Sequence, residues 1–230
     1  MHVEEVLARL EAWSDPHAAA GMARYGIKSD VVYGVSIPLL RSLAREIERD
    51  HALALELWEI AGRETRILAS MTAEPSEGDD RLMEDWVLDF DCWEVCDQVC
   101  MNLFERTPLA FSKAEEWSQR GEEFVKRAGF VLMARLAVSD KAAGDAAFER
   151  FFPLIRRGAA DERNMVKKAV NWALRQIGKR NESLNRRAIG EAEALRELDS
   201  RSARWVASDA LRELGSEAVQ ARLHKKGSQR

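Results

Sequence analysis

The sequence has few cysteines, few histidines and no long apolar run, and so lacks the features typical of disulfide-rich, zinc-binding and membrane-spanning proteins. Its 230 residues include only three cysteines and four histidines, and no apolar run is long enough to cross a bilayer. No charged and then apolar leader follows Met1, so we expect neither a membrane span nor a secretion signal. The length allows a sizeable core, and we interpret residues 1–230 as a single domain.

The cysteines are confined to one short segment. Cys92, Cys96 and Cys100 are spaced four residues apart, which on a helix places them poorly for a disulfide and favours a reducing cytoplasm. No histidine lies nearby in the sequence, so a zinc site has a poor supply of ligands and we expect no metal. The thiols are better interpreted as small core residues.

Charge is distributed unevenly along the chain, whose net charge is −4. Residues 1–100 hold nine Lys/Arg against twenty-one Asp/Glu, a net charge of −12, whereas residues 101–230 hold twenty-six against eighteen, a net charge of +8. The second part has the sign of charge that attracts a polyanion. Ordinary solvated helix faces produce the same asymmetry, and this alternative stays open.

Apolar residues recur every three or four positions almost everywhere, so the sequence predicts an all-α fold. Only residues 31–36 have a strand-like pattern. Helix breaks are expected at 14–21, 72–80, 105–108 and 157–164.

Three segments of the chain match one another. Residues 125–136 and 166–177 align without gaps at an offset of 41, and residues 203–214 follow at an offset of 37. A period near 40 in a helical chain is typical of HEAT-like or armadillo-like solenoids, in which each helix pair buries its apolar stripe against its neighbours. Three unrelated amphipathic helices are the alternative.

The second of these segments has two distinct faces. Helical spacing predicts one apolar stripe, formed by Val166, Ala169, Val170, Ala173 and Ile177. A different face carries an indole among cations, the composition of a surface that meets phosphate, sugar or base, and its residues are Lys168, Trp172, Arg175 and Lys179. A Trp covered by long basic side chains is the structural alternative. Arg127 and Trp205 hold the position of Lys168 in the other two segments. In stacked repeats, side chains at equivalent positions form a row along the concave surface.

Residues 91–104 form a second segment of interest. An apolar stripe is predicted for Cys92, Cys96, Val99 and Leu103, and Trp93 and Asp97 share a different face because they are four residues apart. A carboxylate beside an aromatic surface suits stabilisation of the positive charge that develops on a sugar as a glycosidic bond breaks. Asp97 capping a turn or pairing with an arginine is an equally open interpretation.

Four segments together resemble the AlkD-type DNA alkylation repair family of HEAT-like-repeat alkylpurine DNA glycosylases. The similarity covers nearly the whole chain and is carried by DCWEVCD at 91–97, VKRAGFVL at 125–132, VKKAVNWALR at 166–175 and GMARYGIKSDVVYGVSIPLLRSLAREI at 21–47.

The resemblance implies a C-shaped solenoid whose basic concave face wraps duplex DNA and which hydrolyses the glycosidic bond of N3- and N7-alkylated purines without a base-flipping pocket. Asp97 matches the catalytic carboxylate, Trp93 and Trp172 match indoles that cradle the deoxyribose, and Arg127 and Arg175 match DNA-facing arginines. Lys168 and Lys179 share the face of Arg175 and are predicted to bind DNA with it. No cofactor is implied, and we expect a monofunctional hydrolase that is a monomer in the bacterial cytoplasm, associated with the nucleoid.

The sequence departs from the family pattern at four positions. Cys92 replaces the first of two adjacent tryptophans, Glu94 replaces an aspartate, and Ser36 and Ile37 replace a polar pair near the amino-terminal DNA-contacting turn. Two other functions therefore stay open: a non-catalytic paralogue that binds DNA structures, and a helical-repeat protein-interaction scaffold.

Overall fold

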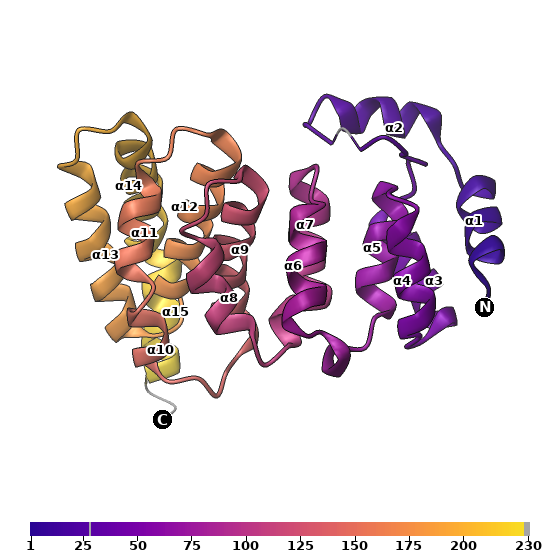
Figure 1. Cartoon of the computed structure of the whole chain (residues 1–230). Helices are drawn as coiled ribbons and strands as arrows, with labels where there is room; N and C mark the ends of the chain where they lie inside the picture. Colours follow the sequence, from indigo (N-terminus) through magenta and orange to yellow (C-terminus); the bar gives the residue numbers. More distant parts are fainter. Residues whose placement is uncertain (28, 228–230) are drawn as a thin grey trace. The chain divides into compact units, whose positions relative to one another are not determined.

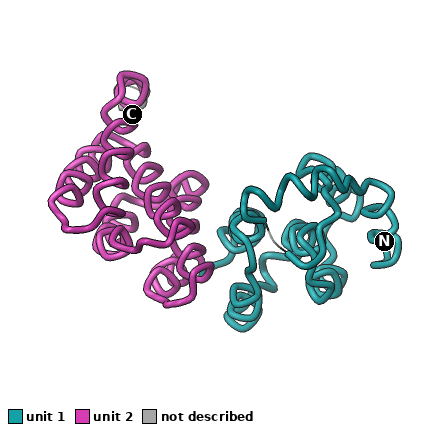
Figure 2. The backbone as a smooth tube through the Cα atoms, turned by 90° about the horizontal axis from the view of Figure 1, so that it is seen from above, with its two compact units in different colours: residues 1–109 teal, residues 110–230 magenta. Residues whose placement is uncertain are grey.

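The computed structural model describes residues 1–27 and 29–227, and these form helices joined by short connections (Figure 1). They fall into two compact units, Met1–Leu109 and Ala110–Arg230, which Figure 2 colours separately. The helices of the first unit are α1 (Val3–Ala12), α2 (Pro16–Ala23), α3 (Ile37–Ile47), α4 (His51–Glu59), α5 (Arg63–Thr72), η1 (Pro75–Glu77), α6 (Asp80–Leu88), α7 (Trp93–Asn102) and η2 (Phe104–Arg106). Those of the second are α8 (Ala110–Trp117), α9 (Glu123–Ser139), α10 (Asp145–Glu149), α11 (Phe152–Ala159), α12 (Asn164–Gly178), α13 (Glu182–Arg196), α14 (Arg201–Leu214) and α15 (Glu217–Gly227). In the described part of the chain, no helix combines the length and the apolar character that a membrane span requires.

Several helices begin at a polar residue that caps them. Asp50 accepts a hydrogen bond from the Leu53 amide at the start of α4, and Asn181 accepts one from the Leu184 amide at the start of α13. Such side chains satisfy amide groups that have no partner within the first helical turn. These local signals determine where the helices begin.

One predicted break is shorter than expected, because a capped helix begins inside it. The sequence predicts a break at 14–21; the structure has a break between α1, which ends at Ala12, and Pro16, but Pro16–Ala23 form α2. Asp15 accepts hydrogen bonds from the amides of His17 and Ala18, and Pro16 occupies the first helical position, where its missing N–H costs nothing. The Asp-Pro pair starts a helix here. The other three predicted breaks coincide with helix boundaries.

The first unit has α5 at its centre, with α3 and α7 packed on either side of it and α4 against it. The indoles of Trp58 in α4 and Trp86 in α6 stack with their centroids 3.9 Å apart. Residues 31–36 form no strand, and Val31 makes a single bridge to Gly62. This extended segment is held mainly by side chains of α5.

The second unit confirms the internal repeat. The three matching segments lie in α9, α12 and α14, and α12 packs against both α9 and α14. The predicted stripe of α12 is its core face, because Val166, Ala169, Val170, Ala173 and Ile177 are all at most 1% exposed. Periodicity therefore predicted both the helices and the faces by which they stack.

Two helical glycines of the second unit provide a test of this packing. Gly129 lies in α9, and a Cβ at this position would be 2.3 Å from the Ser118 backbone nitrogen, so Gly129→Ala is expected to cost about 1–3 kcal/mol of unfolding free energy. Gly190 in α13 has open space instead, and Gly190→Ala is expected to stabilise by up to about 1 kcal/mol. Urea denaturation of both variants measures this difference. Equal stabilities would contradict the close approach of α8 and α9.

Candidate functional site

The helix α7 divides into the two faces that the sequence predicts. Cys92, Cys96, Val99 and Leu103 are fully buried, which confirms the apolar stripe, whereas Trp93 and Asp97 are partly exposed. Burial is the main cause that raises the pKa of the Cys92 thiol, to about 11. The thiol is therefore neutral at physiological pH and packs as a small core residue.

Contacts outside α7 fix the position of the Trp93 indole. Its Nε1 donates a hydrogen bond of 2.9 Å to the backbone carbonyl of Tyr25, in the segment between α2 and α3. One edge of the ring is thus held against this segment. Asp97 follows one helical turn later, so a fixed aromatic ring and a carboxylate are adjacent on one partly exposed face.

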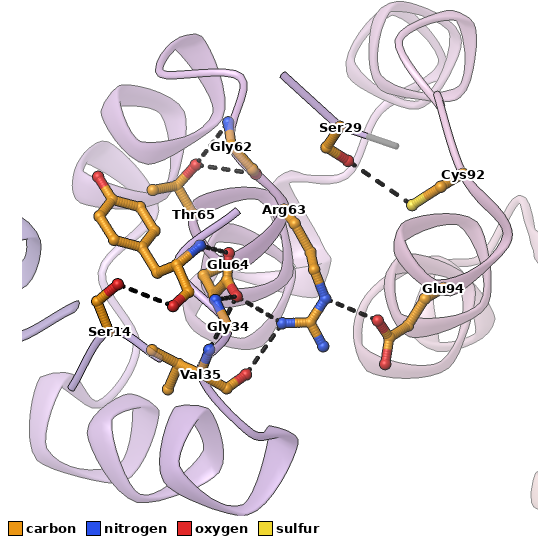
Figure 3. Close-up of polar contacts among 11 residues, drawn as sticks. Ser14, Ser29, Gly34, Val35, Gly62, Arg63, Glu64, Thr65, Cys92 and Glu94 are labelled. Atoms are coloured by element: carbon orange, nitrogen blue, oxygen red, sulfur yellow. Dashed lines mark hydrogen bonds and ion pairs between the residues drawn. The ribbon is translucent and has the colours of Figure 1, made fainter. Parts of the chain in front are cut away.

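The amino-terminal end of α7 is also tied to the rest of the first unit (Figure 3). The Ser29 hydroxyl donates to Asp91 Oδ1 at 3.0 Å. It also lies 3.8 Å from Cys92 Sγ. Arg63 Nε, from the first residue of α5, donates to Glu94 Oε2 at 2.7 Å. Glu94, at one of the positions where the sequence departs from the family pattern, therefore has a partner that fixes the start of α7.

A buried carboxylate holds the segment before α3. Glu64 is fully buried, its Oε2 accepts the amide of Tyr33 at 3.0 Å, and its Oε1 accepts the amides of Gly34 and Val35 at 2.9 and 3.1 Å (Figure 3). Gly34 has φ +80°, and a Cβ there would meet the Asp15 carbonyl oxygen at 2.2 Å, so the turn requires glycine. One side chain thereby fixes three consecutive peptide groups.

Arg63 connects the two anchors. Its Nη1 donates to Glu64 Oε1 at 2.7 Å and to the Val35 carbonyl at 2.9 Å, while its Nε binds Glu94. Burial lowers the pKa of Arg63, but the hydrogen bonds and charges of Glu94 and Glu64 outweigh it, so the net shift is upward. Sequence reasoning missed these residues, because a charged run at a helix start resembles a solvated first turn.

In the second unit, the predicted basic face of α12 lies outside the core. Lys168 is exposed, and Trp172, Arg175 and Lys179 are partly exposed. Arg175 and Lys179 nevertheless already have partners within the protein. Both form ion pairs with Glu213 of α14, and Arg175 also lies 3.4 Å from Asp209. Burial raises the pKa of Glu213, but Lys179 and Arg175 lower it more, so the carboxylate stays charged. DNA contacts by these two cations stay predictions, and they compete with intramolecular carboxylates.

Arg127 differs from its counterparts in the other repeats. It is only 6% exposed, and its Nη1 donates to the Met165 carbonyl at 2.6 Å, which joins α9 to the start of α12. Trp205 in the third repeat is 41% exposed and has Lys167 Nζ 5.0 Å from its ring centroid. The three equivalent positions therefore differ in burial, and the role of Arg127 in DNA binding stays a prediction.

The candidate residues are grouped by unit. Trp93 and Asp97 share α7 in the first unit, and the second unit holds Arg127 on α9 together with Lys168, Trp172, Arg175 and Lys179 at α12. Among the residues that the structure describes, no cluster of His, Cys, Asp and Glu has an arrangement that could bind a metal ion.

Comparisons with known proteins agree with this architecture. The family model for DNA alkylation repair enzymes matches residues 6–214. Among solved structures, the chain is similar to a member of a family described as related to the HEAT-like repeat DNA glycosylases, with affinity for branched DNA structures. That likeness has a TM-score of 0.81 and 18% sequence identity, and covers 97% of this chain and 96% of the other.

A designed armadillo repeat protein in complex with the peptide (KR)4 is less similar, with a TM-score of 0.37 and 13% identity over 80% of this chain and 88% of that one. No curated protein matches the sequence. The likeness with the TM-score of 0.81 confirms the predicted all-α, HEAT-like repeat fold.

Proposed function

The chain belongs to the DNA alkylation repair enzyme family, and from this premise we propose that it is a DNA glycosylase that releases N3- and N7-alkylated purines from duplex DNA. The observation that carries the proposal is the pairing of Trp93 and Asp97 on one partly exposed face of α7. Because the Trp93 indole is anchored through Tyr25 and the start of α7 through Arg63, this face is preorganised before any ligand arrives.

The chemistry of the substrate fits a site with a single carboxylate. An alkylated purine carries a fixed positive charge, so the base leaves without protonation by a strong general acid. The sugar then develops oxocarbenium character, which a nearby negative charge stabilises. In this proposal Asp97 stabilises the sugar and positions water, Trp93 and Trp172 contact the deoxyribose, and Arg127 holds the backbone beside the lesion.

An Asp next to DNA has an electrostatic cost, since phosphates repel it. A role in the transition state is the benefit that offsets this cost. Lys168 on α12 is exposed, and we propose that it contributes to DNA binding together with Arg175 and Lys179. The proposal treats residues 1–230 as one functional domain acting as a monomer at the bacterial nucleoid.

Incubation of the protein with methylated duplex DNA tests the proposal. We expect free 7-methylguanine and 3-methyladenine to accumulate in proportion to enzyme and time, as measured by chromatography of the liberated bases. Unmethylated duplex of the same sequence is the control. Tight DNA binding with no released base from the methylated duplex would contradict the proposal.

A second candidate function is binding of branched DNA without chemistry. It is favoured by the structural neighbour, which is described as having affinity for branched DNA structures. A four-way junction and a linear duplex of equal length distinguish the candidates. A strong preference for the junction together with no base release from methylated duplex supports the second function.

A further inference from the structure

Arginines gather at one place in the otherwise acidic first unit. Residues 1–109 contain ten Lys/Arg against twenty-two Asp/Glu. Four of the ten line a single open cavity of about 240 Å³, whose lining residues are Arg41, Ala44, Arg45, Arg49, Met71, Asn102 and Arg106. This described lining includes no acidic side chain, so a local positive site lies in a unit of opposite net charge.

The cavity is formed where three packed helices end. Arg41 and Arg45 are one turn apart on α3, Arg49 lies two residues beyond the end of α3, and Asn102 is the last residue of α7. All four arginines are exposed. Arg49 has a structural partner, because its Nη1 donates to the Ala73 carbonyl.

The other three arginines are the groups available to a ligand. No carboxylate of a described residue forms an ion pair with Arg41, Arg45 or Arg106. Elsewhere in the unit, by contrast, Arg9, Arg63, Arg66 and Arg81 each pair with a carboxylate. Guanidinium groups that share a cavity repel one another, and an anion placed between them relieves that repulsion.

The kind of anion follows from size and geometry. Pockets that enclose drug-sized ligands have about 300–1,000 Å³, so this smaller and open cavity suits a single polyatomic anion. The planar guanidinium fork binds phosphate oxygens in a bidentate manner. A phosphate group approached by several arginines satisfies both conditions.

We propose that this cavity binds a backbone phosphodiester of the DNA on which the Asp97 site acts, an inference that rests on the proposed function. Asn102 follows Asp97 by five residues on α7, a rise of about 7.5 Å along the helix. The cavity therefore lies at the carboxyl end of α7, about one and a half turns beyond Asp97, and the proposal places its phosphate a few nucleotides from the sugar that Asp97 faces. Arg41, Arg45 and Arg106 set the register of the DNA on the first unit.

The test is the salt dependence of binding to undamaged duplex DNA. The double variant Arg41→Gln, Arg45→Gln is expected to bind about tenfold more weakly at low salt, with a log–log salt slope shallower by about one to two. Arg81→Gln is the matched control, because Arg81 is in the same unit, has a 90% exposed side chain and pairs with Asp85 four residues later. Its affinity and slope are expected to equal those of the unchanged protein. Fluorescence anisotropy across about 50–200 mM salt measures both quantities.

A charge-preserving double variant and a phosphate-binding measurement complete the test. Arg41→Lys, Arg45→Lys preserves the charge and is expected to restore most of the salt slope. A slope and affinity unchanged in the Gln double variant overturn the inference. Binding of inorganic phosphate to the cavity can be measured from NMR shifts of the arginine side chains. If the cavity binds inorganic phosphate but DNA affinity does not depend on these arginines, the inference is also overturned.

Because undamaged DNA is used, binding and excision are separable. An unchanged slope in the double variant alongside normal base release overturns the phosphate site alone. Absence of base release from the unchanged protein, with the slope difference present, overturns the proposed glycosylase activity and supports the phosphate site.

Discussion

Asp97→Asn is expected to slow release of 7-methylguanine from duplex DNA by about 100-fold or more while leaving DNA affinity equal or slightly higher. Loss of one preorganised electrostatic contact to a transition state lowers rates by about 10²–10³-fold. Removal of a negative charge near the phosphates reduces electrostatic repulsion, so DNA affinity is expected not to fall. Single-turnover excision and anisotropy on the same DNA separate the two effects.

The isosteric change Asp85→Asn is the control for Asp97→Asn. Asp85 is also a helical aspartate of the first unit, and its side chain is 67% exposed beside Arg81. We expect its excision rate to equal that of the unchanged protein. Equal excision by Asp97→Asn and Asp85→Asn would remove Asp97 from the mechanism.

Glu64→Ala is expected to cause the largest loss of stability, about 3–5 kcal/mol of unfolding free energy. The fully buried carboxylate accepts three backbone amides and one Arg63 nitrogen, and its removal leaves these donors without their acceptor. Breaking a buried ion pair by deleting one partner typically costs this much. Chemical denaturation followed by circular dichroism measures the change.

Glu46→Ala is the control for Glu64→Ala. Glu46 pairs with Arg9 at 3.0 Å on the surface, where both side chains are 45% exposed, so its loss is expected to cost less than about 1 kcal/mol. A comparable cost for both variants would contradict the anchoring role of Glu64. We also expect Glu64→Ala to reduce excision where the protein remains folded, because Arg63 then loses one of the groups that orient it toward Glu94 at the start of α7.

Sequence reasoning succeeded where a signal is local. The apolar stripes of α7 and α12 repeat with the period of a helix, so each residue's face followed from its position. The same reasoning separated Trp93 and Asp97 from the buried cysteines. At residues 14–21 the predicted break is too long, because Asp15 caps a helix that begins at Pro16.

The pattern of a single helix does not predict which charged side chains form ion pairs with another helix. Arg175 and Lys179 share a face with Trp172, as predicted, yet Glu213 of the next repeat pairs with both. Arg63 and Glu64 resemble a solvated helix start and are instead among the most buried charges of the first unit. In each case the partner comes from an element about thirty to forty residues away in the chain.

Most of the helices, their repeat and the face on which each candidate side chain lies follow from the sequence alone, because hydrogen bonding and apolar periodicity within a helix depend on neighbouring residues only. The tertiary structure alone decided which charged groups neutralise one another and which are left to meet a ligand. Glu64 meets its amides, Glu213 meets its cations and Arg106 joins the arginines at 41, 45 and 49 only after distant helices have packed. Electrostatic partnership depends on distance in space, which the spacing of residues along one chain does not specify.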